Sequence, residues 1–124
     1  MATGPFIRHH RPGAEYWFPE GCYIDELLNE PADPVLSIAR ARVPVGGTTA
    51  WHRVRDAAER YLIVSGQGRV EVGDLPPRDV GPDDVVFIPP GCRQRIANTG
   101  RVDLVFLALC TPRFQASAYE AEGE

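Results

Sequence analysis

Hydrophobic and polar residues alternate along much of this chain in short runs, and glycine, proline, asparagine or aspartate separates the runs. In the clearest run, at positions 39–43, three small apolar residues alternate with Arg40 and Arg42. A period of two is that of a β-strand with one face buried and its charges facing water. No segment repeats apolar residues at the three- and four-residue intervals of an amphipathic helix. The pattern therefore predicts an all-β protein.

The same criteria predict eight short strands with turn residues between them. The predicted strands cover positions 22–28, 35–43, 48–54, 59–64, 69–72, 84–88, 94–98 and 104–110. Their regular spacing is typical of a sandwich or barrel, in which few strand edges stay exposed. We expect an N-terminal arm at 1–20, a β-barrel at 21–113 and a C-terminal tail at 114–124, with a loop at 74–79 that contains Pro76 and Pro77.

Composition and charge narrow the class of protein. The 124 residues suit one domain, and 12 glycines with 12 prolines suit many tight turns. All 13 basic residues are scattered arginines and the net charge is −4, so we expect no nucleic-acid partner. The longest apolar run, 104–110, is too short for a membrane span, and the first residues lack a signal-peptide core. We expect a soluble, cytoplasmic protein.

Two groups of residues between positions 46 and 98 resemble the signature motifs of the cupin superfamily. The first motif is a Gly, a His-x-His, a Glu and a closing Gly, and its matching residues here are Gly46, His52, Glu59 and Gly66. The second ends in Pro-x-Gly, a His and an Asn, and its matching residues are Pro89, Gly91 and Asn98. The resemblance implies a cupin double-stranded β-helix, which is a jelly-roll barrel.

The turn residues of the two motifs match better than the metal ligands do. In the family, three histidines and one glutamate converge on a divalent metal inside the barrel. His52 and Glu59 keep two of these four positions, whereas Val54 and Gln94 stand where two histidines would be. The resemblance therefore supports the fold more strongly than it supports a metal site.

If the cupin register holds, His52, Glu59 and Gln94 point into the barrel, and three accounts of the site stay open. In the first, these side chains hold iron, manganese, zinc or nickel, with open positions for water and substrate. In the second, no metal binds, Glu59 pairs with His52, and Gln94 hydrogen-bonds to one of them or to a ligand. In the third, Glu59 faces solvent. We expect no organic cofactor.

Two further residues are candidates for chemistry. Tyr61 shares a strand face with Glu59 and could orient a ligand or supply a proton, so it is the candidate catalytic residue. Cys110 ends the last apolar strand, and its thiol reaches the site if its face is the inner one.

The resemblance implies two kinds of function. The first is a metal-dependent enzyme of the dioxygenase, isomerase or lyase type that acts on a small organic molecule. The alternative is a non-catalytic cupin that binds a small molecule without metal. Resemblance to other single-domain cupins also implies a homodimer, in which the N-terminal arm or first strand pairs with the partner's sheet.

Overall fold

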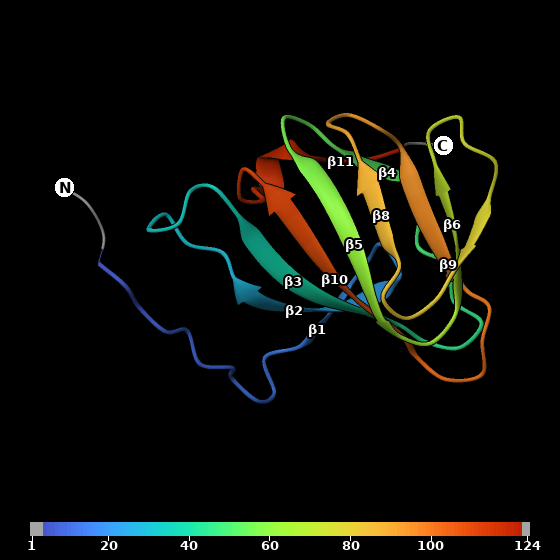
Figure 1. Ribbon diagram of the computed structural model, residues 1–124, viewed down its shortest axis with the longest axis horizontal. Coiled ribbons are helices and arrows are strands. Elements are labelled where there is room, and N and C mark those ends of the chain that lie inside the picture. Colours follow the sequence, from blue (N-terminus) through green and yellow to red (C-terminus); the bar gives the residue numbers. More distant parts are fainter. Residues whose placement is uncertain (1–3, 123–124) are drawn as a thin grey trace.

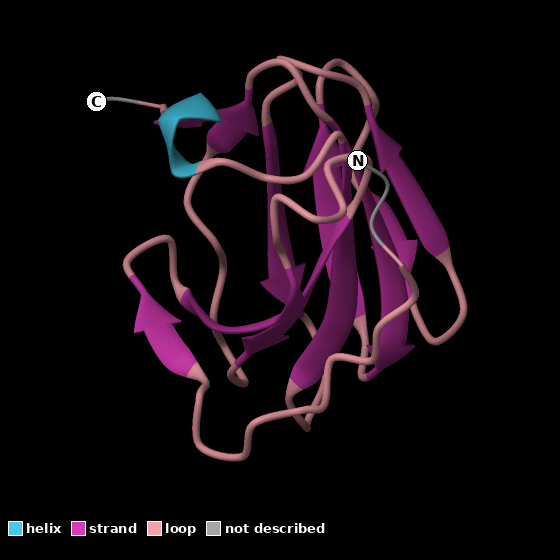
Figure 2. Cartoon of the chain, turned by 90° about the vertical axis from the view of Figure 1, so that its left-hand side faces the viewer, coloured by secondary structure: helices cyan, strands magenta, loops and turns pink. Residues whose placement is uncertain are grey.

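The computed structural model describes residues 4–122, which form two antiparallel sheets with the core between them (Figures 1 and 2). The first sheet has six strands in the order β1 (Tyr16–Phe18), β2 (Cys22–Leu28), β3 (Ser37–Val43), β10 (Leu104–Thr111), β5 (Ala58–Ser65) and β8 (Val85–Ile88). The second has five, in the order β11 (Tyr119–Ala121), β4 (His52–Val54), β9 (Gln94–Asn98), β6 (Gly68–Val72) and β7 (Arg78–Val80). A short 3₁₀ helix, Ala116–Ala118, precedes β11. This arrangement confirms the all-β, double-stranded β-helix fold.

Strand β3 shows how the sequence pattern positions side chains. Ala41 and Val43 are buried in the core, and Arg40 and Arg42 lie on the opposite face of the sheet. On that outer face, the Arg40 guanidinium donates to Asp25 at 2.9 Å. The alternation predicted from the sequence therefore separates an apolar interior from a charged exterior.

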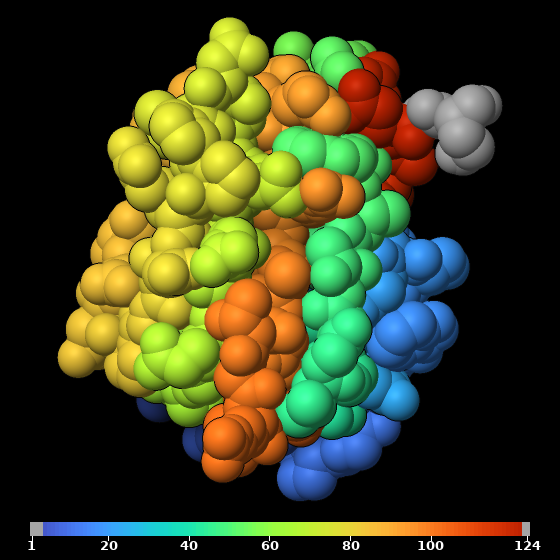
Figure 3. All heavy atoms as spheres, turned by 90° about the vertical axis from the view of Figure 1, so that its right-hand side faces the viewer, coloured from blue at the N-terminus to red at the C-terminus, as the bar shows by residue number. Residues whose placement is uncertain are grey.

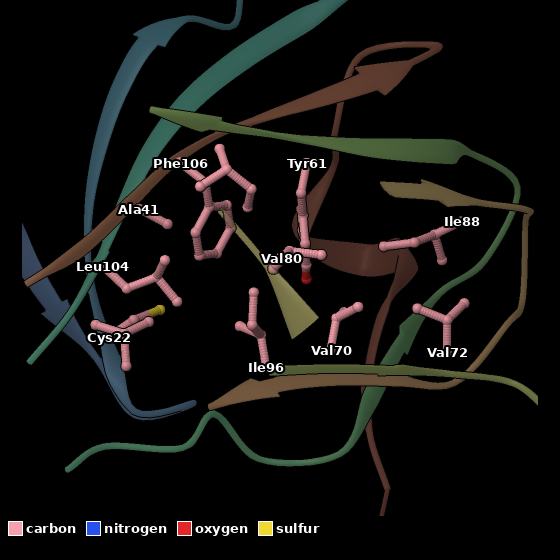
Figure 4. Packing of buried hydrophobic residues seen from close by; sticks show 12 residues of the cluster. Cys22, Ala41, Tyr61, Val70, Val72, Val80, Ile88, Ile96, Leu104 and Phe106 are labelled. Atoms are coloured by element: carbon pink, nitrogen blue, oxygen red, sulfur yellow. The ribbon is translucent and has the colours of Figure 1, made fainter. Parts of the chain in front are cut away.

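The core lies between the inner faces of the two sheets (Figure 4). Its fully buried members come from both sheets and include Val43, Ile63, Ile88, Ile96 and Leu104. Each such side chain contributes on the order of 1.5–3 kcal/mol by leaving water. Figure 3 shows the outer surface of the second sheet, on which the colours of β4, β9, β6 and β7 follow one another across the face.

The predicted strands agree closely with the observed ones in several places. Strands β2 and β9 have the predicted bounds, whereas the range 48–54 contains only the short strand β4 and an isolated bridge at Thr48. Strands β1, β7 and β11 were not predicted. Strand β7 forms in the range expected to be a loop, because it pairs with β6 at the sheet edge, where Arg78 and Asp79 stay exposed and no apolar alternation is needed.

The segment before β1 runs outside the sheets (Figure 1). Polar contacts connect it to them: His10 Nε2 lies 2.7 Å from Asp25 Oδ2, and Glu15 Oε1 lies 2.7 Å from Arg42. Strand β1 lies in the range expected to be the arm, and β11 lies in the range expected to be the tail. No helix within residues 4–122 is long and apolar enough to cross a membrane.

Candidate functional site

A cavity opens at the inner face of the six-stranded sheet, where it meets the end of the second sheet that carries β4 and β11. Residues of β2, β3, β5 and β10 line most of it, and β1, His52 from β4, Tyr119 from β11 and Glu20 from the β1–β2 turn also contribute. The cavity leaves about 730 Å³ of empty space, part of it open to solvent. The cavity thus gathers ionisable side chains against mainly apolar walls.

Glu59, Gln94 and Tyr61 form a buried chain of hydrogen bonds that crosses between the two sheets. Gln94 Nε2 donates to Glu59 Oε1 at 2.9 Å, and the Tyr61 hydroxyl donates to Gln94 Oε1. Glu59 and Tyr61 are two residues apart on β5 and face the same side, while Gln94 comes from β9. Gln94 is fully buried and Glu59 is 9% exposed. The amide of Gln94 therefore has its oxygen and its nitrogen both engaged.

His52 lies beside a second carboxyl group, that of Glu20. The Nδ1 atom of His52 lies 2.8 Å from the carbonyl oxygen of Ala50. Because a carbonyl oxygen can only accept, Nδ1 carries the hydrogen, and Nε2 is the basic nitrogen of the neutral ring. That Nε2 lies 3.4 Å from Glu20 Oε1. The basic nitrogen of His52 therefore faces the Glu20 carboxyl group.

Burial sets the protonation state of each of the two groups. It raises the pKa of Glu20 to about 8, with Glu59 adding repulsion, and it lowers the pKa of His52 against the opposing effect of the Ala50 carbonyl. At neutral pH the carboxyl of Glu20 holds the proton and the imidazole is uncharged. Tyr119 stacks on the His52 ring at 5.4 Å and hydrogen-bonds to Glu20.

The pKa of Glu59 depends on different neighbours from that of Glu20. Burial raises its pKa to about 7, and the hydrogen bond from Gln94 partly opposes this by stabilising the carboxylate. A carboxyl group with this pKa is present in both forms at neutral pH. The cavity therefore offers one carboxyl that is mainly protonated and one that readily gives up or accepts a proton.

The thiol of Cys110 faces this cavity, which answers the question of orientation that the sequence left open. Burial raises its pKa to about 12, and the nearby Glu59 adds to the effect. The thiol is therefore protonated at neutral pH and is a poor nucleophile and a poor metal ligand.

The structure brings the predicted ligands His52, Glu59 and Gln94 into one region, with Gln94 opposite His52 in the β4–β9 pairing. Their donor atoms do not fit a divalent metal as arranged. Gln94 turns its N–H donor toward Glu59 and gives its oxygen to Tyr61. Within the described residues, no group of three or more His, Cys, Asp or Glu side chains is placed to hold a metal ion.

Sequence reasoning missed Glu20 and Tyr119. Glu20 lies in the turn between two short strands, and Tyr119 lies in the last strand, so no periodic pattern or motif marks either residue. Tyr119 lies beside His52 because β11 pairs with β4, which places Tyr119 opposite Val54. Glu20 lies there because the β1–β2 turn contacts the segment before β4, where the backbone N–H of Ala50 donates to the carbonyl oxygen of Glu20 at 2.7 Å.

Comparisons with known proteins show to which family the chain belongs. The model of the cupin domain family matches residues 39–110, which is more than half of the chain. The chain belongs to the cupin domain family. This cupin is 34% identical over 101 residues to uncharacterized protein MJ1618 of Methanocaldococcus jannaschii, and the match covers 80% of each chain.

Solved structures agree with the fold of this cupin. A predicted oxalate decarboxylase from Thermotoga maritima has a TM-score of 0.67 and 28% identity, over 73% of this chain and 80% of that one. Pac13, a nucleoside dehydratase from Streptomyces, has a TM-score of 0.76 and 16% identity, over 94% of this chain and 92% of that one. The second likeness, at this identity, shows the fold alone.

Proposed function

We propose that this cupin binds a small organic molecule in its cavity and moves protons to and from it by general acid–base catalysis. The observation that carries the proposal is the pair of separately tuned carboxyl groups, Glu20 beside His52 and Glu59 beside Gln94, which face one cavity. Two titratable groups whose environments set different protonation states are suited to the roles of acid and base.

The roles follow from the hydrogen-bond partners. The carboxylate form of Glu59 acts as the base and takes a proton from a C–H or O–H bond of the substrate, whose electron pair stays on the substrate. Glu20, with His52 beside it, acts as the acid and donates a proton to the substrate atom on which negative charge develops. Exchange with water then restores both groups.

Gln94 and Tyr61 serve this base as positioning residues. The Gln94 amide fixes one oxygen of Glu59 and is itself held by the Tyr61 hydroxyl. Tyr61, the candidate catalytic residue from the sequence, also lines the cavity and offers its ring to the substrate. In this arrangement its proton is engaged by Gln94.

The metal-dependent alternative, with iron, manganese, zinc or nickel on His52, Glu59 and Gln94, stays a prediction. The orientation of the Gln94 amide counts against it, because an N–H group turned toward Glu59 repels a cation that this carboxylate would bind. Non-catalytic small-molecule binding is the other alternative, and it predicts binding without proton exchange.

The test is solvent exchange in heavy water. A mixture of small organic molecules with acidic C–H bonds, in cationic, neutral and anionic forms, is incubated with the protein, and deuterium uptake is measured by mass spectrometry. We expect uptake in at least one molecule and a loss of about 10²- to 10⁴-fold in Glu59→Gln. Glu71→Gln, on the outer face of β6 next to Arg95, is the matched control and keeps full activity.

The outcome separates the alternatives. Uptake that survives both Glu59→Gln and Glu20→Gln contradicts the acid–base proposal. No uptake in any molecule that binds the protein supports the non-catalytic alternative.

A further inference from the structure

The described side chains that line the cavity include acidic groups but no arginine or lysine. Three of them are carboxyl groups, from Glu20, Glu26 and Glu59, and no arginine lines the cavity within residues 4–122. The chain contains no lysine at all. An anionic molecule in this cavity therefore finds no cationic side chain to pair with it.

The arginines lie elsewhere because of strand alternation. Arg60 stands between Glu59 and Tyr61 on β5 and points to the outer face, where its guanidinium lies 5.2 Å from the centre of the Phe87 ring. On β9, Arg95 next to Gln94 points outward and stacks over Trp51 at 4.5 Å. The register that turns the carboxyl groups inward thus turns the neighbouring guanidinium groups outward.

One carboxylate oxygen in the cavity is open to a ligand. Gln94 donates to Oε1 of Glu59, and no described residue donates to Oε2. Every fully buried side-chain oxygen in residues 4–122 has a hydrogen-bond partner, so this oxygen is accessible from the cavity. Glu59 is 9% exposed, and a ligand that reaches Oε2 meets a carboxylate largely removed from bulk water.

The walls beside these carboxyl groups are apolar and partly aromatic. Phe18 packs edge-on against Tyr119 at 5.3 Å, and Phe106 lies 4.4 Å from Tyr61 between ring centres. All four rings line the cavity. Aromatic faces attract cations, and the attraction increases where water is excluded.

We propose that the ligand of this cavity is an organic cation, an amine or quaternary ammonium compound with an apolar body, and that the cavity rejects carboxylates and other anions. The inference rests on the proposed use of this cavity for small-molecule binding and names its substrate class. An ammonium group pairs with Oε2 of Glu59, and the apolar body covers the aromatic walls. A hydrated metal ion makes no use of those walls.

Four probes of similar shape and different charge test the inference: benzyltrimethylammonium, benzylammonium, benzyl alcohol and benzoate. Affinity is measured by titration calorimetry near neutral pH, with fluorescence as a second readout. We expect both cations to bind at least about tenfold more tightly than benzyl alcohol, and benzoate to bind most weakly. Tighter binding of benzoate than of the cations, or equal binding of all four probes, overturns the inference, as does no binding of any probe at millimolar concentration.

Variants connect the selectivity to the named residues. Glu59→Gln keeps the shape of the side chain and its contact with Gln94, and it should remove most of the preference for cations while leaving the affinity for benzyl alcohol within about twofold. Glu71→Gln, outside the cavity, should change neither. A cation preference that persists unchanged in Glu59→Gln overturns the assignment.

The inference and the proposed function can fail separately. Cation binding without deuterium uptake supports the ligand class and argues against catalysis. Deuterium uptake confined to anionic molecules supports acid–base catalysis and overturns the ligand class.

Discussion

Glu20 and Glu59 are carboxyl groups that the fold removes from water, and this has a consequence for stability. Their pKa values rise from 4.5 to about 8 and about 7, so the folded state binds more protons than the unfolded state between those limits. The stabilisation is complete below pH 4.5 and is lost as the pH rises through the folded-state values.

We therefore predict that the free energy of unfolding falls between about pH 4.5 and 8, by up to about 1.4 kcal/mol per pH unit for each group. Urea unfolding at a series of pH values measures this. Glu20→Gln removes its share of the slope, because the amide does not titrate. Equal slopes in the parent and in Glu20→Gln would contradict the burial effect.

The metal site can be tested by introducing the two histidines that the family motif has and this chain lacks. Val54 lines the cavity, Gln94 lies opposite His52 in the β4–β9 pairing, and both stand where two ligand histidines would be. We predict that the parent purifies without stoichiometric iron, manganese, nickel or zinc, and that the double variant Val54→His with Gln94→His gains such binding. Plasma mass spectrometry measures the metal content. Stoichiometric metal in the parent that is lost in Glu59→Ala would sink this account.

Part of the site could be predicted residue by residue. The spacing of His52, Glu59 and Gln94 identified three polar residues that the structure places in one region, and strand parity added Tyr61. The spacing could not indicate how the Gln94 amide is turned, since this depends on partners from two strands. Glu20 could not be found, because its contact with His52 depends on a turn distant in sequence.

Turns between elements depend on single glycines in this fold. Gly66, in the turn between β5 and β6, has a φ of +88°, and a Cβ there would lie 2.6 Å from the carbonyl oxygen of Asp103. Gly91 has a φ of +75° and no atom within 4 Å of the same position. The two glycines share the backbone conformation and differ in the space around them.

We predict that Gly66→Ala destabilises the fold by more than Gly91→Ala. The left-handed conformation costs each alanine about 1 kcal/mol, and the contact with the Asp103 backbone adds a further cost only at position 66. Urea unfolding of the two variants measures the difference. Equal losses of stability in the two variants would contradict this prediction, because they would show that the backbone at Asp103 moves aside without cost.

The sequence pattern predicted the central elements better than the peripheral ones. Strands β2, β3, β9 and β10 alternate or run apolar because each buries a face in the core, and that requirement is visible in the sequence. Strand β7 buries little, and β1 and β11 are three residues long. Their pairing comes from neighbouring strands, so local pattern could not reveal them.

The arginines of the strands lie on the outer faces of the sheets, where several pair with carboxylates, whereas among the described residues the cavity is lined by three carboxyl groups and by no arginine. The sequence predicted an all-β barrel with outward arginines. It did not predict that acidic side chains line the cavity, because this depends on which residues the fold brings together. That property belongs to the assembled fold.

The homodimer expected from the resemblance is a further proposal at this scale. Strands β1 and β8 are edges of the six-stranded sheet, and Trp17 and Phe87 on them are 52% and 55% exposed. Exposed edges favour pairing with a second copy. We predict a sedimentation mass of twice 13.7 kDa, and a mass of 13.7 kDa at all concentrations would contradict the dimer.

The most direct test of the acid–base account is a carbon-13 NMR titration of the glutamate carboxyl carbons, with assignments from Glu20→Gln and Glu59→Gln. The account predicts that one carboxyl titrates near pH 8 and is lost in the first variant, and that another titrates near pH 7 and is lost in the second. If both groups titrate near pH 4.5, the carboxyl groups are ordinary solvated acids and the proposed division into acid and base is wrong.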